Sequence, residues 1–315
     1  MRYHIYFHDD FDGMASSAVM LDFLRTQGDE IASYNPIDYY PGLIERWAKF
    51  KFKKPFILVD FRYHPQAAWW FDHHSTSFIS EKWRKEFVNS KTKYFDPRHK
   101  SVCGMVVAHL ERTFQYRPPK HITYLAKWAD IADSASYKSA KQFIEKKEPA
   151  LKLILFLDSL NSENSASHKQ KVASIKLLSD VPIIEIIKMP QISAEVARLL
   201  AKSRNTLKKF KKLSNVYGKV LFSNIIGSDI SGTNLLGYFF YPKIFYSVRT
   251  SYEGGHYHIG VGKNIWRRSD KVNIGKIMTK YGGGGHDGVG GAENKSQKEI
   301  MKIAQEIIEY LNKHG

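Results

Sequence analysis

The chain contains a single cysteine, Cys103, among 315 residues. One cysteine excludes an internal disulfide framework and a zinc site built from thiolates, and its expected role is that of a small core residue. No apolar run reaches the roughly 20 residues that a membrane-spanning helix needs. The N-terminus enters the apolar run 3–7 without the pattern of a signal peptide. We therefore expect a cytoplasmic protein with no membrane partner.

Acidic side chains are also scarce. The chain has 48 lysines and arginines against 31 aspartates and glutamates, which gives a formal net charge of +17. Such an excess favours polyanionic partners such as nucleic acids and nucleotides, although a lysine-rich solvated surface is the simpler alternative. Hydrophobic residues make up 43% and aromatic residues 14%, which is enough for ordinary cores. The length favours two domains.

Metal-ligand side chains are concentrated in four short clusters. They are His8-Asp9-Asp10-Phe11-Asp12-Gly13, Val59-Asp60, Asp72-His73-His74 and Asp130-Ile131-Ala132-Asp133. Taken singly, the first two are equally typical of a surface turn, a helix N-cap or the end of a strand. Taken together, hard carboxylates and imidazoles suit Mn²⁺ or Mg²⁺, and a pair of such ions commonly serves phosphate ester cleavage. The set predicts a two-metal phosphoesterase.

The first half of the chain has the pattern of an α/β domain. Aromatic and β-branched runs predict strands at 3–7, 55–60 and 67–72, and the last two end in carboxylates. Apolar periodicity predicts helices at 15–25, 101–114, 121–132, 152–160 and 172–178. Because open parallel sheets bind ligands at the carboxyl ends of their strands, the clusters are expected to meet there. We predict a parallel sheet with helices on both faces.

A second, smaller α/β domain is predicted after a boundary near 182–190. Segment 193–213 has the pattern of a basic amphipathic helix, and its basic side is either a solvated face or a nucleic-acid stripe. Strands are predicted at 220–225, 244–250 and 257–261, and helices at 233–238, 274–280 and 296–313. The predicted domains are residues 1–185 and 216–315, with a linker helix at 186–215.

These motifs resemble the DHH phosphoesterase superfamily, in the subgroup that carries a C-terminal DHHA1 domain. His8-x-Asp10-x-Asp12-Gly13 is similar to the first motif, Asp60 to the second and Asp72-His73-His74 to the motif that names the family. Asp133 is similar to the fourth-motif aspartate, and Gly282–His286 matches the GGGGH signature of DHHA1. The resemblance covers essentially the whole chain in the family order. It implies a DHH domain, a DHHA1 domain and an active-site cleft between them.

The resemblance also implies a role for each ligand. One metal would be held by His8, Asp10 and Asp60, and the other by Asp12, Asp60, His73 and Asp133. His74 would face the scissile phosphate as an electrophile or proton donor, and Asp72 would orient the cluster. Asp60, shared by both ions, is counted with the catalytic residues. Asp130 competes with Asp133 for the fourth motif, and the Ile-Ala-Asp context favours Asp133.

Substrate binding is expected in the second domain. Ser247-Val248-Arg249 resembles a family strand in which the arginine grips a terminal phosphate. The backbone amides of Gly283, Gly284 and Gly285 would bind phosphate, and His286 would add a hydrogen bond or charge. The chain departs from the family after this run, because Asp287 stands where an alanine is frequent. Tyr252 and Trp266 are candidate platforms for bases.

The predicted function is Mn²⁺-dependent hydrolysis of short oligonucleotides, with Mg²⁺ as the alternative ion. It resembles that of the compact two-domain nanoRNases, which also implies a 3′-phosphonucleotide phosphatase role. A RecJ-like single-strand exonuclease is the alternative within the class, and a nucleotide-binding module without turnover is the alternative outside it. The expected partners are short single-stranded RNA, DNA or nucleotides. The oligomeric state stays open, with a homodimer among the options.

Overall fold

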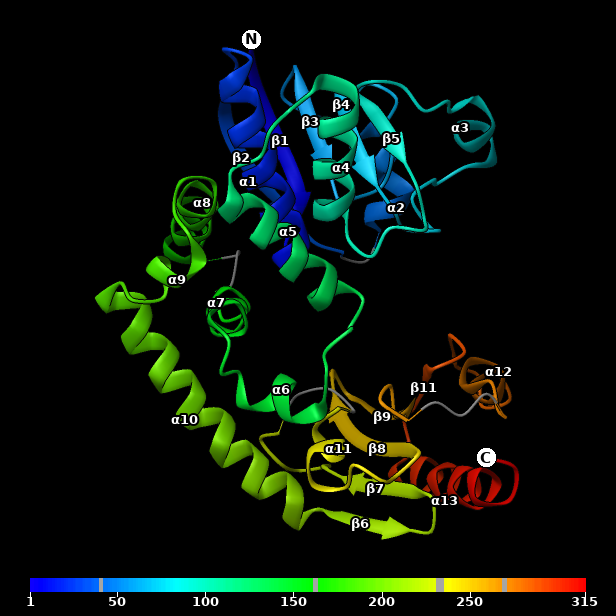
Figure 1. Ribbon diagram of the computed structural model, residues 1–315. Coiled ribbons are helices and arrows are strands. Elements are labelled where there is room, and N and C mark those ends of the chain that lie inside the picture. The colour runs from blue at the N-terminus through cyan, green and yellow to red at the C-terminus, as the bar shows by residue number, and fades with distance from the viewer. Residues whose placement is uncertain (40–41, 161–163, 231–234, 268–270) are drawn as a thin grey trace. The chain divides into compact units, whose positions relative to one another are not determined.

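The computed structural model (Figure 1) describes residues 1–39, 42–160, 164–230, 235–267 and 271–315. It divides into two compact units: Met1–Tyr137 with Lys147–Ala197, and Lys138–Lys146 with Arg198–Gly315. The segment predicted as a linker helix forms α10 (Pro190–Lys212), and the division falls within this helix. Segment Lys138–Lys146, which we assigned to the first domain, groups with the second unit because Ala140 is buried in that unit's core.

The first unit contains the predicted parallel sheet. Its strands are β1 (Arg2–His8), β2 (Glu30–Ile37), β3 (Phe56–Val59), β4 (Trp69–Asp72) and β5 (Lys93–Phe95). All neighbours are parallel, in the order β2-β1-β3-β4-β5. The strands predicted at 3–7, 55–60 and 67–72 are confirmed as the three central ones. The two edge strands were not predicted, because β2 carries a proline and polar residues and β5 is only three residues long.

Helices and short turns cover both faces of this sheet. The helices of the unit are α1 (Phe11–Thr26), α2 (Leu43–Arg46), η1 (Trp47–Lys49), α3 (Glu81–Glu86), α4 (Val102–Phe114), α5 (Lys120–Asp133), α7 (Pro149–Leu157), α8 (Ser165–Asp180) and α9 (Ile183–Ile186). Helices α1 and α4 contact the sheet on one side, where Phe23 of α1 packs edge-on against Trp69 of β4. On the other side, Trp47 and Leu43 join an aromatic cluster with Trp70.

This two-sided burial explains why the central strands read as continuous apolar runs. All four residues of β3, Phe-Ile-Leu-Val, are buried, as are all four of β4. Successive side chains point to opposite faces, so each strand feeds both cores. The carboxylates at the ends of β3 and β4 are therefore held by strands that are buried on both faces.

The second unit is built on a mixed six-stranded sheet. Its strands are β6 (Ser214–Tyr217), β7 (Val220–Asn224), β8 (Tyr246–Glu253), β9 (His256–Lys263), β10 (Gly284–Gly285) and β11 (Val289–Asn294), in the order β10-β11-β9-β8-β7-β6. Only β7 and β8 pair in parallel. Its helices are α6 (Ala140–Glu145), α11 (Leu236–Phe240), α12 (Ile274–Thr279) and α13 (Gln297–His314).

One core of this unit, which contains Ala140, lies around Leu221 and Tyr238, and the other lies between the sheet and α12 and α13. Val248 and Val261 of the sheet pack with Ile300, Ile307 and other apolar residues of these helices. The strands predicted at 220–225, 244–250 and 257–261 correspond to β7, β8 and β9, and no strand was predicted for the glycine run that forms β10 and the start of β11. Part of the helix expected at 233–238 lies outside the described residues. Within the described part of the chain, no helix is long and apolar enough to span a membrane.

Candidate metal centre

Three of the four metal-ligand clusters lie at one edge of the parallel sheet. His8 is the last residue of β1, Asp60 follows β3 directly, and Asp72 is the last residue of β4. These strands are adjacent and parallel. Their carboxyl ends therefore bring the clusters together, although the clusters are separated by up to 64 positions in sequence (72 minus 8).

The first cluster turns sharply from β1 into α1. Asp10 caps the helix, with its Oδ1 accepting a hydrogen bond from the Gly13 amide at 2.9 Å. A Cβ at Gly13 would lie 2.1 Å from the carbonyl oxygen of His8, so only glycine fits. His8, Asp10 and Asp12 occupy a strand end, an N-cap and the first helical turn, respectively.

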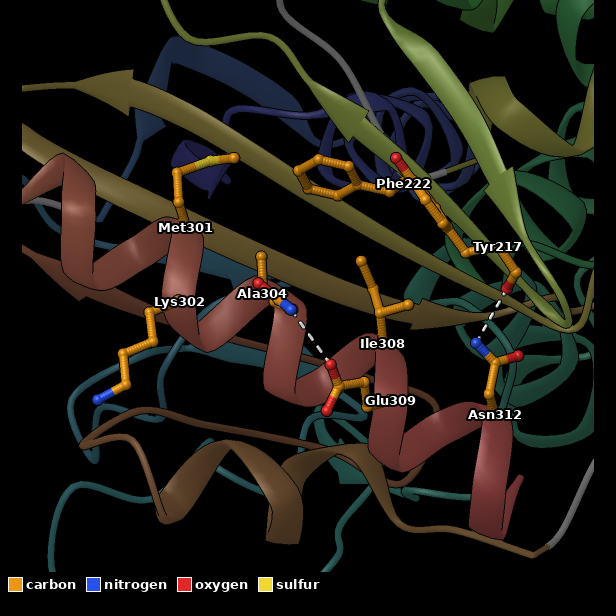
Figure 2. Close-up of a pocket in the computed structure, with 9 residues that line it drawn as sticks. Tyr217, Phe222, Met301, Lys302, Ala304, Ile308, Glu309 and Asn312 are labelled. Atoms are coloured by element: carbon orange, nitrogen blue, oxygen red, sulfur yellow. Dashed lines mark hydrogen bonds between the residues drawn. The ribbon is translucent and has the colours of Figure 1, made fainter.

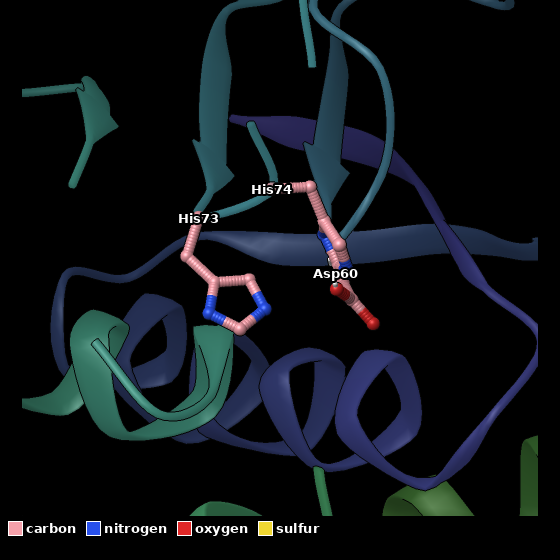
Figure 3. A group of neighbouring side chains, drawn as sticks. All are labelled: Asp60, His73 and His74. Carbon is pink, nitrogen blue, oxygen red and sulfur yellow. Dashed lines mark ion pairs between the residues drawn. The ribbon is translucent and has the colours of Figure 1, made fainter. Parts of the chain in front are cut away.

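Three sets of side chains place their ligand atoms within 4.8 Å of one another. They are His8, Asp10 and Asp60; Asp12, His73 and Asp133; and Asp60, His73 and His74. The first two sets correspond to the ligand groups that the family resemblance implies, except that Asp60 is not in the second. Figure 3 shows the third set, in which the two histidines follow β4 and His74 lies toward Asp60. The structure thus brings all six predicted metal ligands into one site.

Asp60 is the most informative residue of the site. Its side chain is 1% exposed, and neither carboxylate oxygen has a hydrogen-bond partner among the described residues. Burial, followed by the charges of Asp12 and Asp10, raises the pKa of Asp60 well above its ordinary value. Its backbone is left-handed, at φ 58°, which is unusual for a non-glycine residue. A buried carboxylate without a partner is costly unless a cation balances it.

His73 presents one nitrogen to the site. Its Nδ1 lies 2.9 Å from the carbonyl oxygen of His99, so Nδ1 carries the proton and donates it. Its Nε2 is buried, has no hydrogen-bond partner among the described residues and lies 3.3 Å from Asp133 Oδ2. Burial lowers the pKa of His73, but the neighbouring Asp133 carboxylate outweighs this effect and raises the pKa to about 9. Backbone orientation of an imidazole in this way is typical of metal-binding histidines.

Asp72 positions the histidine pair and belongs to none of the three sets. Its Oδ1 accepts hydrogen bonds from the His73 and His74 amides, at 2.8 and 3.2 Å, and from His74 Nδ1 at 2.8 Å. Its Oδ2 accepts a bond from Ser77 Oγ at 2.5 Å. Asp72 therefore fixes the orientation of His74 and leaves Nε2 of that ring free of this bond. The geometry supports the orienting role that the resemblance implies.

The two candidate aspartates of the fourth cluster have different neighbours. Asp133 lies with Asp12 and His73, whereas Asp130 accepts a hydrogen bond from Ser101 Oγ at 2.5 Å. The Asp130 carboxylate also lies against Gly104, where a Cβ would be 2.4 Å from Oδ1. Asp130 therefore interacts with the N-terminal end of α4, where Ser101 is the N-cap residue. This arrangement favours Asp133 as the ligand.

Asp12 is anchored by the same helix. It accepts hydrogen bonds from the backbone amides of Val102 at 2.6 Å and Cys103 at 2.9 Å. Burial, followed by the charge of Asp133 and then that of Asp10, raises the pKa of Asp12 well above its ordinary value. A helix N-terminus offsets part of the negative charge that the cluster concentrates here.

Two supporting residues were missed by sequence reasoning. Ser77 holds Asp72, and Lys171 of α8 forms a 2.7 Å ion pair with Asp9, with both side chains at most 10% exposed. Neither belongs to a motif, and α8 is polar along most of its length. Their roles depend on contacts between distant segments, which no local pattern reports.

The second unit has a polar pocket of about 510 Å³ at Arg249. Gly283 lines it with Arg249, as do Glu253, His258 and Glu293, whereas Gly284, Gly285 and His286 are not among its lining residues. Burial lowers the pKa of Arg249, whose Nε is buried with no hydrogen-bond partner among the described residues. The pocket therefore combines one arginine, whose Nε has no hydrogen-bond partner among the described residues, with two acids.

The predicted amide nest is largely occupied by the fold itself. The amide of Gly283 donates to the Met278 carbonyl at 3.0 Å, and that of His286 donates to the Val289 carbonyl at 2.7 Å. Gly284 and Gly285 form β10, which pairs with β11. Asp287, the departure from the family pattern, pairs with Lys263 at 2.6 Å. The glycines permit close strand pairing, and Gly283 alone among Gly283, Gly284 and Gly285 lines the Arg249 pocket.

A further pocket of the second unit, about 640 Å³, lies between α13 and strands β6 and β7 (Figure 2). Met301, Ala304 and Ile308 of α13 face Tyr217 and Phe222 of the sheet. None of the predicted site residues lines it. The candidate platform Tyr252 is 50% exposed and lies 4.6 Å from Tyr257, measured between ring centroids, whereas Trp266 packs against the core around Tyr238.

Solved structures share this fold over the whole chain. A pGpG-specific phosphodiesterase, PggH from Vibrio cholerae, matches with a TM-score of 0.76 and 19% identity, covering 99% of this chain and 100% of that one. RecJ from Thermus thermophilus, in complex with Mn²⁺, matches with a TM-score of 0.55 and 12% identity, covering 98% and 52%. An exopolyphosphatase-related protein from Bacteroides fragilis matches with a TM-score of 0.53 and 13% identity, covering 99% and 92%.

One curated relative shares a short stretch of sequence. The bifunctional oligoribonuclease and PAP phosphatase NrnA of Mycoplasma pneumoniae is 40% identical over 53 residues, which are 16% of this chain and 16% of that protein. No family model matches the chain. With the structural matches, these findings confirm that the chain has the fold of the DHH/DHHA1 phosphoesterase superfamily, as its motifs predict.

Proposed function

We propose that this protein is a two-metal phosphoesterase that hydrolyses phosphodiester bonds in short oligonucleotides or dinucleotides. The observation that carries the proposal is the buried carboxylate of Asp60, which has no hydrogen-bond partner among the described residues and belongs to two of the three sets of metal-ligand side chains. A carboxylate that only capped a helix or a turn would be hydrogen-bonded to the backbone, because a buried charge without a partner is strongly unfavourable.

The donor set fits two divalent cations. His8, Asp10 and Asp60 would hold one ion, and Asp12, Asp60, His73 and Asp133 the other. Carboxylates and imidazoles without thiolates favour Mn²⁺, with Mg²⁺ as the alternative. When bound, such a pair supplies Lewis acidity that activates water and offsets the charge of the phosphoryl group.

His74 is the residue proposed to act on the substrate. Its side chain is 41% exposed, whereas those of Asp60 and Asp72 are 1% exposed. With Nδ1 bonded to Asp72, Nε2 can donate a hydrogen bond to a phosphate oxygen or a proton to a leaving oxygen when the ring is protonated. A phosphate oxygen or leaving oxygen of the substrate would thus meet His74 Nε2 in a fixed orientation.

The substrate class is supported by three findings. The similar proteins are a pGpG-specific phosphodiesterase and a bifunctional oligoribonuclease and PAP phosphatase. Their names indicate dinucleotide, oligonucleotide or nucleotide substrates. The net charge of +17 favours anionic ligands. The Arg249 pocket offers a guanidinium suited to a terminal phosphate, and we propose this role for Arg249 and Gly283.

End-labelled RNA and DNA from two to about thirty nucleotides, with a 3′-phosphonucleotide alongside, would test the proposal. We expect Mn²⁺-dependent turnover concentrated on two- to five-mers. Phosphate release from the mononucleotide would add the phosphatase role. Hydrolysis of long strands would favour the RecJ-like alternative. The fold is similar to that of RecJ. Mn²⁺ binding without any turnover would reject the hydrolase and favour a binding module.

A further inference from the structure

We propose that Tyr39 and Arg62 form a nucleotide-binding subsite beside the metal centre, in which the tyrosine stacks on a base and the arginine binds a phosphate. The proposal rests on the proposed function, because it assumes a nucleotide substrate. It places the recognition of a base in the first unit, within the same packed domain as the metal ligands. Sequence reasoning singled out neither residue.

Tyr39 is an exposed aromatic ring held at a fixed position. It is 46% exposed, and its ring stacks on Phe61 with centroids 4.7 Å apart and planes 30° apart. Phe61 itself is buried and follows Asp60 directly. A large apolar ring left exposed on a rigid support is the feature that proteins use to stack bases of any sequence.

Arg62 is a cation without an acidic partner in the part of the chain that the structure describes. Its Nε is buried and has no hydrogen-bond partner there, and its guanidinium carbon lies 5.5 Å from the centroid of the Tyr39 ring. A buried donor without an acceptor is costly, so a ligand that supplies an oxygen is favoured. A guanidinium matches a phosphate with two parallel hydrogen bonds.

Both residues adjoin the metal ligands. The ring of Tyr39 lies 5.5 Å from that of His8, and His8 Nδ1 lies 3.6 Å from Asp60 Oδ2. Arg62 follows Asp60 by two residues. A phosphate bound at the metal centre would therefore have a second cation and a stacking surface within one nucleotide's reach. A base-free substrate, such as an inorganic polyphosphate, would leave the tyrosine unused.

The first experiment compares two substrates on the full-length protein with Mn²⁺. One is a dinucleotide, and the other is the same phosphodiester with abasic riboses. Base stacking predicts that Tyr39→Ala raises KM for the dinucleotide by about 5- to 150-fold and leaves the abasic diester unchanged. Tyr39→Phe should retain most of the affinity. Arg62→Met should raise KM for both substrates, and Arg62→Lys should do so less, because it keeps the charge without the planar fork.

Tyr124→Ala is the matched control. Tyr124 is 39% exposed and lies on α5 in the same unit, outside the proposed subsite. We expect the kinetics of Tyr124→Ala to equal those of the parent. We also expect the Mn²⁺ dependence of Tyr39→Ala to equal that of the parent. Equal losses on both substrates in Tyr39→Ala, or no change on either, would overturn the stacking role.

A binding measurement separates this proposal from the proposed function. A dinucleotide containing 2-aminopurine loses fluorescence when its base stacks on an aromatic ring. We expect quenching on binding to the Asp60→Asn variant and loss of that quenching when Tyr39→Ala is added. Quenching that survives Tyr39→Ala would overturn the subsite even in an active enzyme. Tyr39-dependent quenching in a parent without turnover would support the subsite and reject the hydrolase.

Discussion

The two units prepare their sites in opposite ways. In the first, carboxylates and imidazoles at the ends of buried parallel strands converge, and the Asp60 carboxylate has no hydrogen-bond partner among the described residues. In the second, one arginine lines a polar pocket beside a glycine strand whose amides are mostly paired. The first unit therefore concentrates carboxylates around a buried aspartate, and the pocket of the second unit contains an arginine whose Nε has no hydrogen-bond partner among the described residues. We interpret the cluster of the first unit as a cation-binding site and the Arg249 pocket of the second unit as an anion-binding site.

Glycine, in contrast, has the same structural role in both units. Gly13 lets the chain pass directly over the His8 carbonyl, which brings Asp10 and Asp12 to the cluster. Gly283 lets β10 approach β11, with a Cβ position 2.0 Å from the Gly291 carbonyl oxygen. In both units the glycine serves close packing of backbone, and the ligand chemistry comes from side chains.

Removing Asp60 should produce the largest effect. We expect Asp60→Asn to lower turnover by roughly 1,000-fold or more, because both proposed ions lose a shared ligand. The metal-free variant should unfold at a higher temperature than the metal-free parent, since an uncompensated buried charge is removed. Thermal melts with and without Mn²⁺ check this. A variant that melts lower than the parent without metal would contradict the description of Asp60 as an unbalanced charge.

Glycine substitutions should separate structural from permissive positions. Gly13→Ala should destabilise the protein by about 3 kcal/mol or more and weaken Mn²⁺ binding, because its Cβ would overlap the His8 carbonyl. Gly284→Ala is the control, since no atom lies within 4 Å of its Cβ position. Urea unfolding and a metal titration provide the readouts. Equal unfolding free energies for the two variants would contradict the close approach at Gly13.

The metal-free protein should lose stability as pH rises. The folded pKa of His73 is about 9, above its ordinary 6.5, so its contribution is complete below pH 6.5 and is lost as pH rises through 9. One such group contributes on the order of 1–3 kcal/mol. Mn²⁺ should reverse the trend, because its ligands bind deprotonated. Melting curves between pH 6 and 9.5 test this, with His73→Asn as the control that should flatten the metal-free dependence.

Arg249 should affect substrate affinity alone. We expect Arg249→Met to raise KM for a substrate with a terminal phosphate by about 10- to 100-fold, through loss of a charge-assisted contact. The apparent affinity for Mn²⁺ should not change. Arg267→Met, an exposed arginine that lies over Phe245 in the same unit, is the matched control. A loss of Mn²⁺ affinity in Arg249→Met would remove the distinction between the two sites.

Much of the fold was predictable from local pattern. The central strands of the parallel sheet are continuous apolar runs, and β7, β8 and β9 have β-branched and aromatic residues. The missed strands have weaker patterns: β2 contains Pro36, and β11 begins Val-Gly-Gly. These are edge or near-edge elements, whose pairing depends on neighbours more than on their own composition.

The candidate site was predictable as a set of residue types and less so as a geometry. The motifs named every member of the three ligand sets, because the family resemblance covers each of those positions. The Ile-Ala-Asp context favours Asp133 over Asp130, and the tertiary structure adds the grouping of Asp133 with Asp12 and His73 and the contact of Asp130 with Ser101. Ser77, Lys171, Tyr39 and Arg62 carried no signal in the sequence.

The amino-acid sequence by itself determined the α/β class, the strand-end carboxylates and the glycine that turns β1 into α1, since each depends on residues near one another in the chain. The tertiary structure decided which strands are neighbours, which aspartate faces the cluster and which polar atoms remain unsatisfied. These depend on strand order and on packing between distant segments. Burial acts on the assembled sheet, so the unbalanced charge of Asp60 exists only once β1, β3 and β4 lie side by side.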